Sequence, residues 1–407
     1  KVDPTTLSLF EDAVMTQESI VILAAKRTPI GSFQGMLSGA TASQLGGAAI
    51  GGALAASGLA PELVNEVIMG CVLPAGQGQA PARQAALKAG IPDSVPATTI
   101  NKMCGSGMKA VMMAADGLRS GDSDFAVAGG LESMTNAPYL LLKARAGYRM
   151  GHGELLDHMF YDGLQSPFDG KLMGCFGDAT AAKYGFTREQ QDAFAAESVR
   201  RAQASVAEGR FAAEIVPVTV KGRKGDTVVN VDETPGACDL AKIPTLKAAF
   251  NKDGTVTAAS SSSISDGAAA VVLARASAAA ARGLQPVARI VSYASHANAP
   301  EWFTTAPVGA LQKALAKAGW QAGEVDLYEI NEAFAVVAMA AIHDLKLDHA
   351  KVNVNGGACA LGHPVGATGA RIIATLIAAL QARGGKRGVA ALCIGGGEAT
   401  AIAIELV

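Results

Sequence analysis

The sequence has few aromatic residues, little net charge and no long apolar run. Phenylalanine, tryptophan and tyrosine make up 5% of its 407 residues, and the formal net charge is −2. A charge so near zero argues against the basic surface that binds nucleic acid. The longest uncharged stretch, residues 28–61, is interrupted by polar residues and glycines, and is well short of the roughly 20 apolar residues that a membrane span needs. We therefore expect neither nucleic acid nor a membrane as a partner.

The cysteines show no regular spacing that would indicate a disulfide framework. Six thiols in a chain of 407 residues suit a reducing compartment, so we expect a cytoplasmic protein. Cys71, Cys175 and Cys238 are expected to be inert. Residues 1–14 contain no long apolar stretch, which argues against a secretory signal. We expect this segment to be an extension ahead of a natural start at Met15.

What the sequence has in abundance is small apolar residues. Half of its residues are hydrophobic and 47 are glycines. A chain of this length is too long for one ordinary core, so two or three domains are expected. With so few aromatic rings, packing must depend on close approach between backbones.

Cys104 lies at a predicted turn between a strand and a helix. The β-branched run at residues 98–100 predicts the strand, and residues 108–118 carry the apolar stripe of a helix. Gly105 and Gly107 are expected to permit the sharp turn between them. A thiol beside a helix N-terminus is expected to have a lowered pKa, as a nucleophile requires.

A second interpretation uses the same residues. Gly105-x-Gly107-x-x-Ala110 follows a strand and opens a helix, as in a dinucleotide-binding fingerprint, and Glu132 follows the next predicted strand at residues 125–128. The pattern is short and tolerant, so other parts of the chain must decide.

Polar groups recur at equivalent turns in the second half of the chain. His363 lies in a glycine-rich loop before a predicted helix at residues 370–382. Cys393 ends a predicted buried strand, and Asn331 follows another strand and is expected to begin a helix. Open α/β sheets bind ligands at such strand ends.

Together these motifs resemble the thiolase family, from about Ser19 to the C-terminus. The matching segments are Asn-Lys-Met-Cys104-Gly-Ser-Gly, Asn331-Glu-Ala-Phe-Ala, Gly-His363-Pro-Val-Gly-Ala-Thr-Gly and Cys393-Ile-Gly-Gly-Gly. Four motifs in the family's order make the dinucleotide interpretation a minor alternative. Thiolases make or break the carbon–carbon bond of a 3-ketoacyl-CoA.

The resemblance implies a role for each residue at the site. Cys104 is the nucleophile that carries the acyl group, and His363 is its base and an oxyanion donor. Cys393 is the second acid–base group. Asn331 holds a water that supports the enolate oxygen, and the backbone N–H of Gly395 serves the oxygen on the acyl-enzyme side.

The resemblance also implies the substrates and how they are bound. Ser262 and Met173 are expected to line the pantetheine channel, with Ala333 and Phe334 beside it. The substrates and products are acetyl-CoA, acetoacetyl-CoA and CoA, and no cofactor is expected to be tightly bound. The fold implied is α/β, with five layers in the order αβαβα built from two similar halves. We assign residues 15–134 with about 264–285 to the first half and 286–407 to the second, with a CoA-covering loop domain at residues 135–263.

Metal binding is the other use of cysteine and histidine. Cys359-x-x-x-His363 could place two ligands together, but no further pair lies nearby, and zinc requires three or four protein ligands. We therefore expect no metal, and a packing role for Cys359. The other histidines are expected at the surface or in loops: His152, His158, His296, His343 and His349.

Acyl-chain preference is the least determined property. The chain departs from the best-known biosynthetic thiolases at Leu172, where they carry histidine. A short-chain acetyl-CoA C-acetyltransferase is the favoured function, and a broader-chain 3-ketoacyl-CoA thiolase of fatty-acid breakdown is the alternative. A non-catalytic CoA- or lipid-binding protein is the alternative of another class.

Thiolases form dimers that often pair into tetramers. Residues 139–142 place Tyr139 and three leucines in a segment that is otherwise expected to be exposed, and such an apolar patch is typical of an interface. We therefore expect a homotetramer built as a dimer of dimers, with Leu140 to Leu142 near a subunit contact or under the CoA-covering loop.

Overall fold

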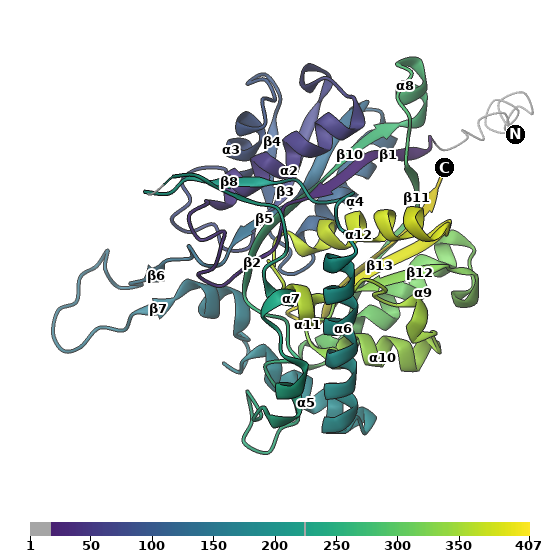
Figure 1. Ribbon diagram of the computed structural model, residues 1–407. Coiled ribbons are helices and arrows are strands. Elements are labelled where there is room, and N and C mark those ends of the chain that lie inside the picture. The colour runs from purple at the N-terminus through teal and green to yellow at the C-terminus, as the bar shows by residue number, and fades with distance from the viewer. Residues whose placement is uncertain (1–17, 224) are drawn as a thin grey trace, which may run out of the picture.

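The computed structural model describes residues 18–223 and 225–407 (Figure 1). The extension expected at residues 1–14 lies outside the described residues. A mixed sheet of ten strands runs through the molecule, and it consists of two halves that repeat the same arrangement.

The first half of the sheet has five main strands in the order β4-β3-β5-β10-β1. The three strands β3, β4 and β5 are parallel, whereas β10 runs antiparallel to both of its neighbours. A short strand, β2, pairs with the beginning of β10. Their bounds are β1 (Ile20–Arg27), β2 (Gly31–Ser32), β3 (Glu66–Gly70), β4 (Ala97–Ile100), β5 (Phe125–Ser133) and β10 (Ser265–Arg275).

The second half repeats this order with β12-β13-β14-β11. Strands β12 and β13 are parallel, and β14 is antiparallel to β13 and β11. A parallel bridge between Tyr328 and Val352 stands at the edge that β4 occupies in the first half. Two residue pairs between β1 and β11 join the halves. The bounds are β11 (Ala288–Ala297), β12 (Leu327–Ile330), β13 (Arg387–Ile394) and β14 (Glu398–Leu406).

Helices form three layers around these two halves. Helices α2 (Ala42–Ser57) and α3 (Pro81–Lys88) pack on the first half, and α9 (Ala306–Ala318) and α10 (Ala335–Leu345) pack on the second. Between the two halves lie α4 (Ser106–Ser120) and α12 (Thr368–Arg383), whose apolar residues share one core with strands of both halves. The five-layer αβαβα arrangement is confirmed.

The central helix α12 shows why so many small residues are needed. All of its residues from 368 to 380 are buried, as expected for a helix covered on every side. A Cβ atom on Gly369 would lie 2.3 Å from the backbone nitrogen of Met108 in α4. Glycine is therefore required where the two central helices meet.

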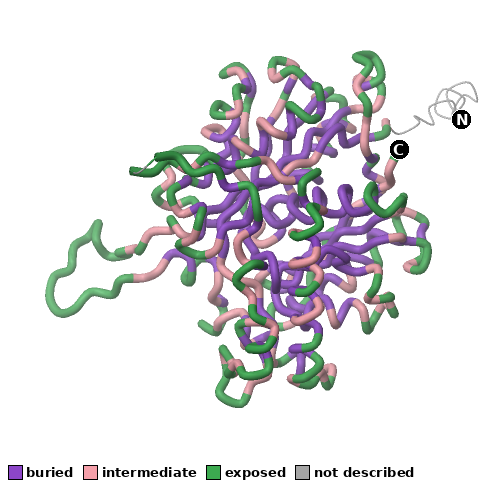
Figure 2. The backbone as a smooth tube through the Cα atoms, in the orientation of Figure 1, coloured by how far each residue is buried: buried purple, intermediate pink, exposed green. Residues whose placement is uncertain are grey.

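A long excursion separates β5 from β10. It contains two hairpins and several helices: β6 (Tyr139–Leu140), β7 (Leu156–Asp157), a π-helical turn (Phe160–Leu164), α5 (Met173–Tyr184), α6 (Arg188–Ala207), β8 (Val218–Val220), β9 (Thr227–Val229), α7 (Thr234–Ala237) and a 3-10 helix (Leu240–Thr245). The β6–β7 hairpin projects from the body and is exposed along most of its length (Figures 1 and 2). The remaining short helices are α8 (Ala276–Ala281), α11 (Ala358–Leu361) and four 3-10 turns (Pro61–Leu63, Pro300–Thr305, Ala322–Glu324 and His349–Lys351).

A buried ion cluster anchors this excursion to the sheet. Arg27, at the end of β1, is fully buried and donates from Nε to Glu214 at 2.6 Å. Its two terminal nitrogens bind Asp232 in a bidentate pair at 2.7 and 2.8 Å. Removing one partner would leave a buried charge uncompensated, which is strongly destabilising.

In the part of the chain that is described, no helix is both long and apolar enough to cross a membrane.

Candidate active site

Cys104 lies on a strained turn between β4 and α4. Met103, the residue before it, has a φ of +50°, which is uncommon for a residue other than glycine. Two polar side chains hold this turn: the backbone N–H of Met103 donates to Asn101 Oδ1 at 2.8 Å, and that of Lys102 donates to Ser106 Oγ at 2.8 Å. Backbone strain of this kind often accompanies functional sites.

The glycines that follow Cys104 act by close packing. Gly105 has an ordinary φ of −82°, so the expectation that it supplies the turn geometry is wrong. A Cβ atom on Gly105 would lie 2.4 Å from Ile394 Cδ1, and one on Gly107 would lie 2.8 Å from the backbone nitrogen of Ala370. These close contacts, rather than a left-handed backbone, explain why glycine occupies both positions.

The environment of Cys104 raises the pKa of its thiol. The side chain is half-buried among apolar residues. Burial raises the pKa of Cys104 to about 11, although hydrogen bonds from the backbone N–H groups of Gly395 and of Cys104 itself lower it. The nearby Glu132 carboxylate raises it further. The expected lowered pKa is therefore wrong, because desolvation outweighs the helix terminus.

His363 is buried and its tautomer is fixed by its neighbours. Its Nδ1 lies 2.6 Å from the Thr368 hydroxyl, which donates its own proton to the Pro364 carbonyl at 3.0 Å. Nδ1 must therefore carry the proton, and Nε2 keeps a free lone pair with no partner among the described residues. Burial, assisted by the Arg371 charge, lowers the pKa of His363 to about 3. The ring is thus a neutral acceptor.

Cys393 ends β13 and is completely buried. It packs in an apolar cluster with Phe176, Phe303 and Phe334. Burial raises the pKa of its thiol well above the usual value, and the charge of Cys104 raises it further. The two cysteines, one from each half of the molecule, are therefore neighbours.

Asn331 follows β12 in a loop whose backbone is tied to β13. Its N–H donates to the Ala391 carbonyl at 2.9 Å. Helix α10 begins only at Ala335, so the expectation that the helix starts at Asn331 is wrong. Both amide atoms of Asn331 are buried and have no hydrogen-bond partner among the described residues. A buried amide of this kind is available to a ligand or a water.

Glu332 fixes the loop that carries Asn331. Its carboxylate accepts hydrogen bonds from the Ser198 hydroxyl at 2.7 Å, Asn353 Nδ2 at 2.8 Å and the Cys359 N–H at 3.1 Å.

Cys359 is buried in α11 and so packs behind the His363 loop as predicted. Throughout residues 18–223 and 225–407, no group of three or more His, Cys, Asp or Glu side chains is arranged to hold a metal ion.

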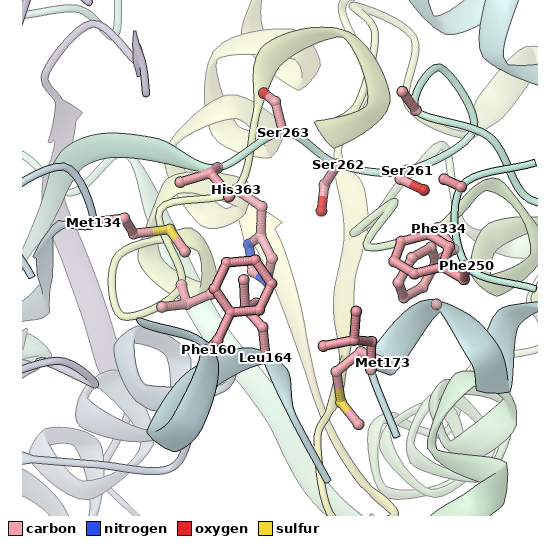
Figure 3. Close-up of a pocket in the computed structure, with 16 residues that line it drawn as sticks. Met134, Phe160, Leu164, Met173, Phe250, Ser261, Ser262, Ser263, Phe334 and His363 are labelled. Atoms are coloured by element: carbon pink, nitrogen blue, oxygen red, sulfur yellow. The ribbon is translucent and has the colours of Figure 1, made fainter. Parts of the chain in front are cut away.

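An apolar cavity of about 350 Å³ opens onto His363 (Figure 3). Three residues predicted to bind CoA line it: Met173, Ser262 and Phe334. Ala333 does not line it, but its carbonyl accepts the Ser262 N–H at 2.9 Å. Several other lining residues carried no signal in the sequence: Phe160, Leu164, Ala249, Phe250 and Ala258.

A second cavity, of about 290 Å³, lies next to the first. It is lined by Gly395, Gly396 and Met103, and Met173 borders both cavities. The site therefore has space on the side of His363 and on the side of the Gly395 N–H.

His158 is the one histidine whose expected position was wrong. It is only 5% exposed, and its Nδ1 pairs with Asp162 at 2.6 Å. Its neighbour Met159 belongs to the apolar cluster against which Cys104 packs. His158 is a polar residue in a short, irregular segment, and nothing in the sequence of that segment indicates that it is buried.

Comparisons with known proteins agree with this geometry. Residues 20–277 match the thiolase N-terminal domain and residues 284–406 match the thiolase C-terminal domain. The chain is 50% identical to the acetyl-CoA acetyltransferase of Allochromatium vinosum over 390 residues, covering 95% of this chain and 99% of the relative. The acetyl-CoA acetyltransferase of Escherichia coli is also 50% identical over 390 residues, again covering 95% of this chain and 99% of the relative.

A solved structure shows the same architecture. The crystal structure of the Bacillus anthracis acetyl-CoA acetyltransferase superimposes with a TM-score of 0.94 at 41% sequence identity, covering 96% of this chain and 99% of that one. The family domains span nearly the whole described chain, and the residues of all four motifs converge on one site. The chain belongs to the thiolase family.

Proposed function

We propose that this protein is an acetyl-CoA C-acetyltransferase, which condenses two acetyl-CoA molecules to acetoacetyl-CoA and CoA and catalyses the reverse cleavage. The observation that carries the proposal is the free lone pair of His363 Nε2 at the end of an apolar channel, in a site with two neighbouring thiols. The names of the relatives support the choice of acetyl-CoA.

In the first half-reaction, Cys104 attacks the thioester carbon of acetyl-CoA. Because the pKa of its thiol is about 11, it is protonated at neutral pH and must lose its proton as it attacks. His363 Nε2 takes that proton. The backbone N–H groups of Cys104 and Gly395 support the oxyanion. The bond from the carbon to the CoA sulfur then breaks, and His363 returns the proton to the CoA thiolate.

In the second half-reaction, Cys393 acts as the base. As Cys393 removes a proton from the methyl group of a second acetyl-CoA, the proton of its own thiol passes to His363. The charged His363 and a water held by Asn331 support the enolate oxygen. The enolate carbon attacks the acetyl carbon on Cys104, the bond to sulfur breaks, and His363 returns its proton to the Cys104 thiolate. The resting site is restored with both thiols protonated.

A broader-chain 3-ketoacyl-CoA thiolase is the second candidate. It is favoured by the apolar lining of the channel, which includes Leu172 together with Phe160 and Leu164. Both candidates use the same catalytic residues and differ only in the acyl group that is accepted.

The loop domain proposed at residues 135–263 would cover the CoA. Its residues Met173 and Ser261 to Ser263 line the channel, which supports this role.

We propose that CoA is bound only as substrate and product, without a tightly bound cofactor. Free thiols at all six cysteines support a reducing, cytoplasmic location.

We further propose a homotetramer assembled through the β6–β7 hairpin. Leu141 and Leu142 are 50% and 60% exposed, and Tyr139 is 62% exposed. At least half of each of these side chains is exposed, which weakens the alternative that they belong to the core of their own domain. Leu140 is half-buried within β6, so the interface would use its neighbours.

Cleavage rates measured over a series of 3-ketoacyl-CoA chain lengths test the proposed function. We expect the wild-type protein to cleave acetoacetyl-CoA fastest, and Cys104→Ser to be inactive. Equal or faster cleavage of long chains would favour the second candidate. CoA binding without any turnover would indicate the non-catalytic alternative.

A further inference from the structure

Glu132, at the end of β5, is a fully buried carboxylate to which the proposed mechanism gives no role. Its Oε2 accepts hydrogen bonds from the backbone N–H groups of Val72 and Gly366, both at 2.9 Å. Its Oε1 accepts the N–H of Leu73 at 3.1 Å and faces the Cys71 thiol at 3.6 Å. Both oxygens are thus engaged with surrounding backbone.

These donors come from the two parts of the molecule that meet at the active site. Val72 and Leu73 follow β3 in the first half, and Gly366 lies in the loop that carries His363. The backbones of the two halves are in direct contact at this point. A Cβ atom on Gly130 would lie only 1.9 Å from the Gly366 carbonyl oxygen. Among the described residues of the first half, Glu132 is the only side chain that hydrogen-bonds residues 363–369.

The same contacts form the pocket around Cys104. Val72 and Leu73 belong to one apolar cluster with Val365, and Cys104 packs against that cluster. Through its hydrogen bonds, Glu132 therefore links the pocket wall formed by the first half to the pocket wall formed by the His363 loop.

We propose that Glu132 is a positioning residue that sets the separation between Cys104 Sγ and His363 Nε2. The inference rests on the proposed function, in which His363 takes the Cys104 proton. Rate depends steeply on this separation, because a displacement of about 1 Å at a reacting pair can cost about a hundredfold.

The charge of Glu132 works against catalysis, which makes the proposal distinguishable from an electrostatic role. A carboxylate near Cys104 raises the pKa of the thiol and so disfavours its ionisation. If charge were the dominant effect, Glu132→Gln would speed attack by Cys104. If position dominates, Glu132→Gln slows the attack by Cys104. The glutamine amide has only one acceptor oxygen, whereas the backbone N–H groups around Glu132 bind two carboxylate oxygens in the wild-type protein.

The test uses Glu132→Gln, Glu132→Asp and Glu132→Ala at about pH 8.5, where the wild-type carboxylate is ionised even though burial raises its pKa to about 7. Asp326→Asn is the matched control. Asp326 Oδ2 also accepts two backbone N–H groups, from Lys386 at 2.7 Å and Arg387 at 2.8 Å, at the opposite ends of the strands. Alkylation of Cys104 by iodoacetamide, acetyl transfer from acetyl-CoA and thermal unfolding are measured for each.

We expect both rates to fall about a hundredfold in Glu132→Ala and about tenfold in Glu132→Gln, with the KM for acetyl-CoA changed less than about twofold. Glu132→Asp, which keeps the charge but shortens the reach, should also be slow. Asp326→Asn should lose thermal stability but keep both rates.

Two results would overturn the proposal. One is a Glu132→Gln variant that reacts as fast as or faster than wild type. The other is a rate loss that follows the loss of stability equally in Glu132→Gln and Asp326→Asn. If Glu132→Ala fails to fold, the Gln and Asp variants decide. Alkylation needs no CoA, so it tests the positioning of Cys104 even if wild-type protein proves unable to transfer acetyl groups.

Discussion

Replacing Thr368 by valine should disable His363 without altering its surroundings. The Thr368 hydroxyl is the acceptor for the His363 Nδ1 proton, and both residues are buried. Valine has nearly the same shape but cannot accept that proton. The ring must then leave a buried N–H unpaired or move its proton to Nε2, which would remove the lone pair that serves as the base.

The magnitude follows from the cost of the lost hydrogen bond. An unpaired buried donor costs about 1–3 kcal/mol. Each 1.4 kcal/mol corresponds to about a tenfold change in rate, so kcat should fall roughly fivefold to a hundredfold. The KM for acetyl-CoA should change little, because Thr368 does not line the channel.

Steady-state condensation and the rate of acetyl transfer to Cys104 provide the assay. Thr375→Val is the matched control, since Thr375 is also fully buried on α12 and donates one hydrogen bond, to Glu214 at 3.1 Å. The reasoning would be refuted if Thr368→Val kept a kcat within about twofold of the control.

Three further outcomes follow from the same geometry. Alkylation of Cys104 should rise with pH beyond pH 9 without a plateau near neutrality, because the pKa of its thiol is raised to about 11 by burial; a plateau below pH 8 would contradict this. Lys102, in the turn that carries Cys104, forms an ion pair with Glu398, which follows the glycines at residues 395–397. Reversing either charge should slow acetyl transfer up to about fivefold, and reversing both should restore it. Additive losses in the double variant would disprove the link. The double variant Leu141→Glu/Leu142→Glu should lower the mass seen by light scattering from tetramer to dimer, and an unchanged tetramer would move the interface elsewhere.

Most of the framework could be predicted because local patterns determine it. The strands and helices around Cys104 and His363 follow apolar periodicity, and the expected helices at residues 108–118 and 370–382 lie within α4 and α12. The resemblance to thiolases implied the five layers, and equivalent strands recur in both halves of the structure. Strand β5 continues to Ser133, beyond the predicted end, because small residues such as Gly129 and Gly130 fit against β10 and the His363 loop.

The wrong expectations for the pKa of Cys104 and for the position of His158, and the missed channel residues, share a physical cause, which is burial that only the tertiary structure creates. The helix terminus at Cys104 suggested a lowered pKa, but desolvation by burial raises it. His158 is buried through contacts that its own segment does not indicate. The channel residues Phe160 and Phe250 lie about 90 positions apart in the sequence, so no local spacing could group them.

Glu132 shows both the use and the limit of sequence reasoning. Its position after a predicted strand made it part of the alternative dinucleotide-binding pattern. The structure instead surrounds it with three backbone donors from two distant loops. Only the fold brings those donors together, so only the fold reveals what the carboxylate does.

Trapping the acetyl group on Cys104 tests the central claim most directly. Cys393→Ser, incubated with acetyl-CoA, digested and analysed by mass spectrometry, should carry an acetyl group on Cys104 and should release CoA once per site. It should form no acetoacetyl-CoA, since a serine hydroxyl is a far weaker acid than a thiol and cannot supply the carbon base. An acetyl group found solely on another residue, or condensation at the wild-type rate, would contradict the division of labour between the two cysteines.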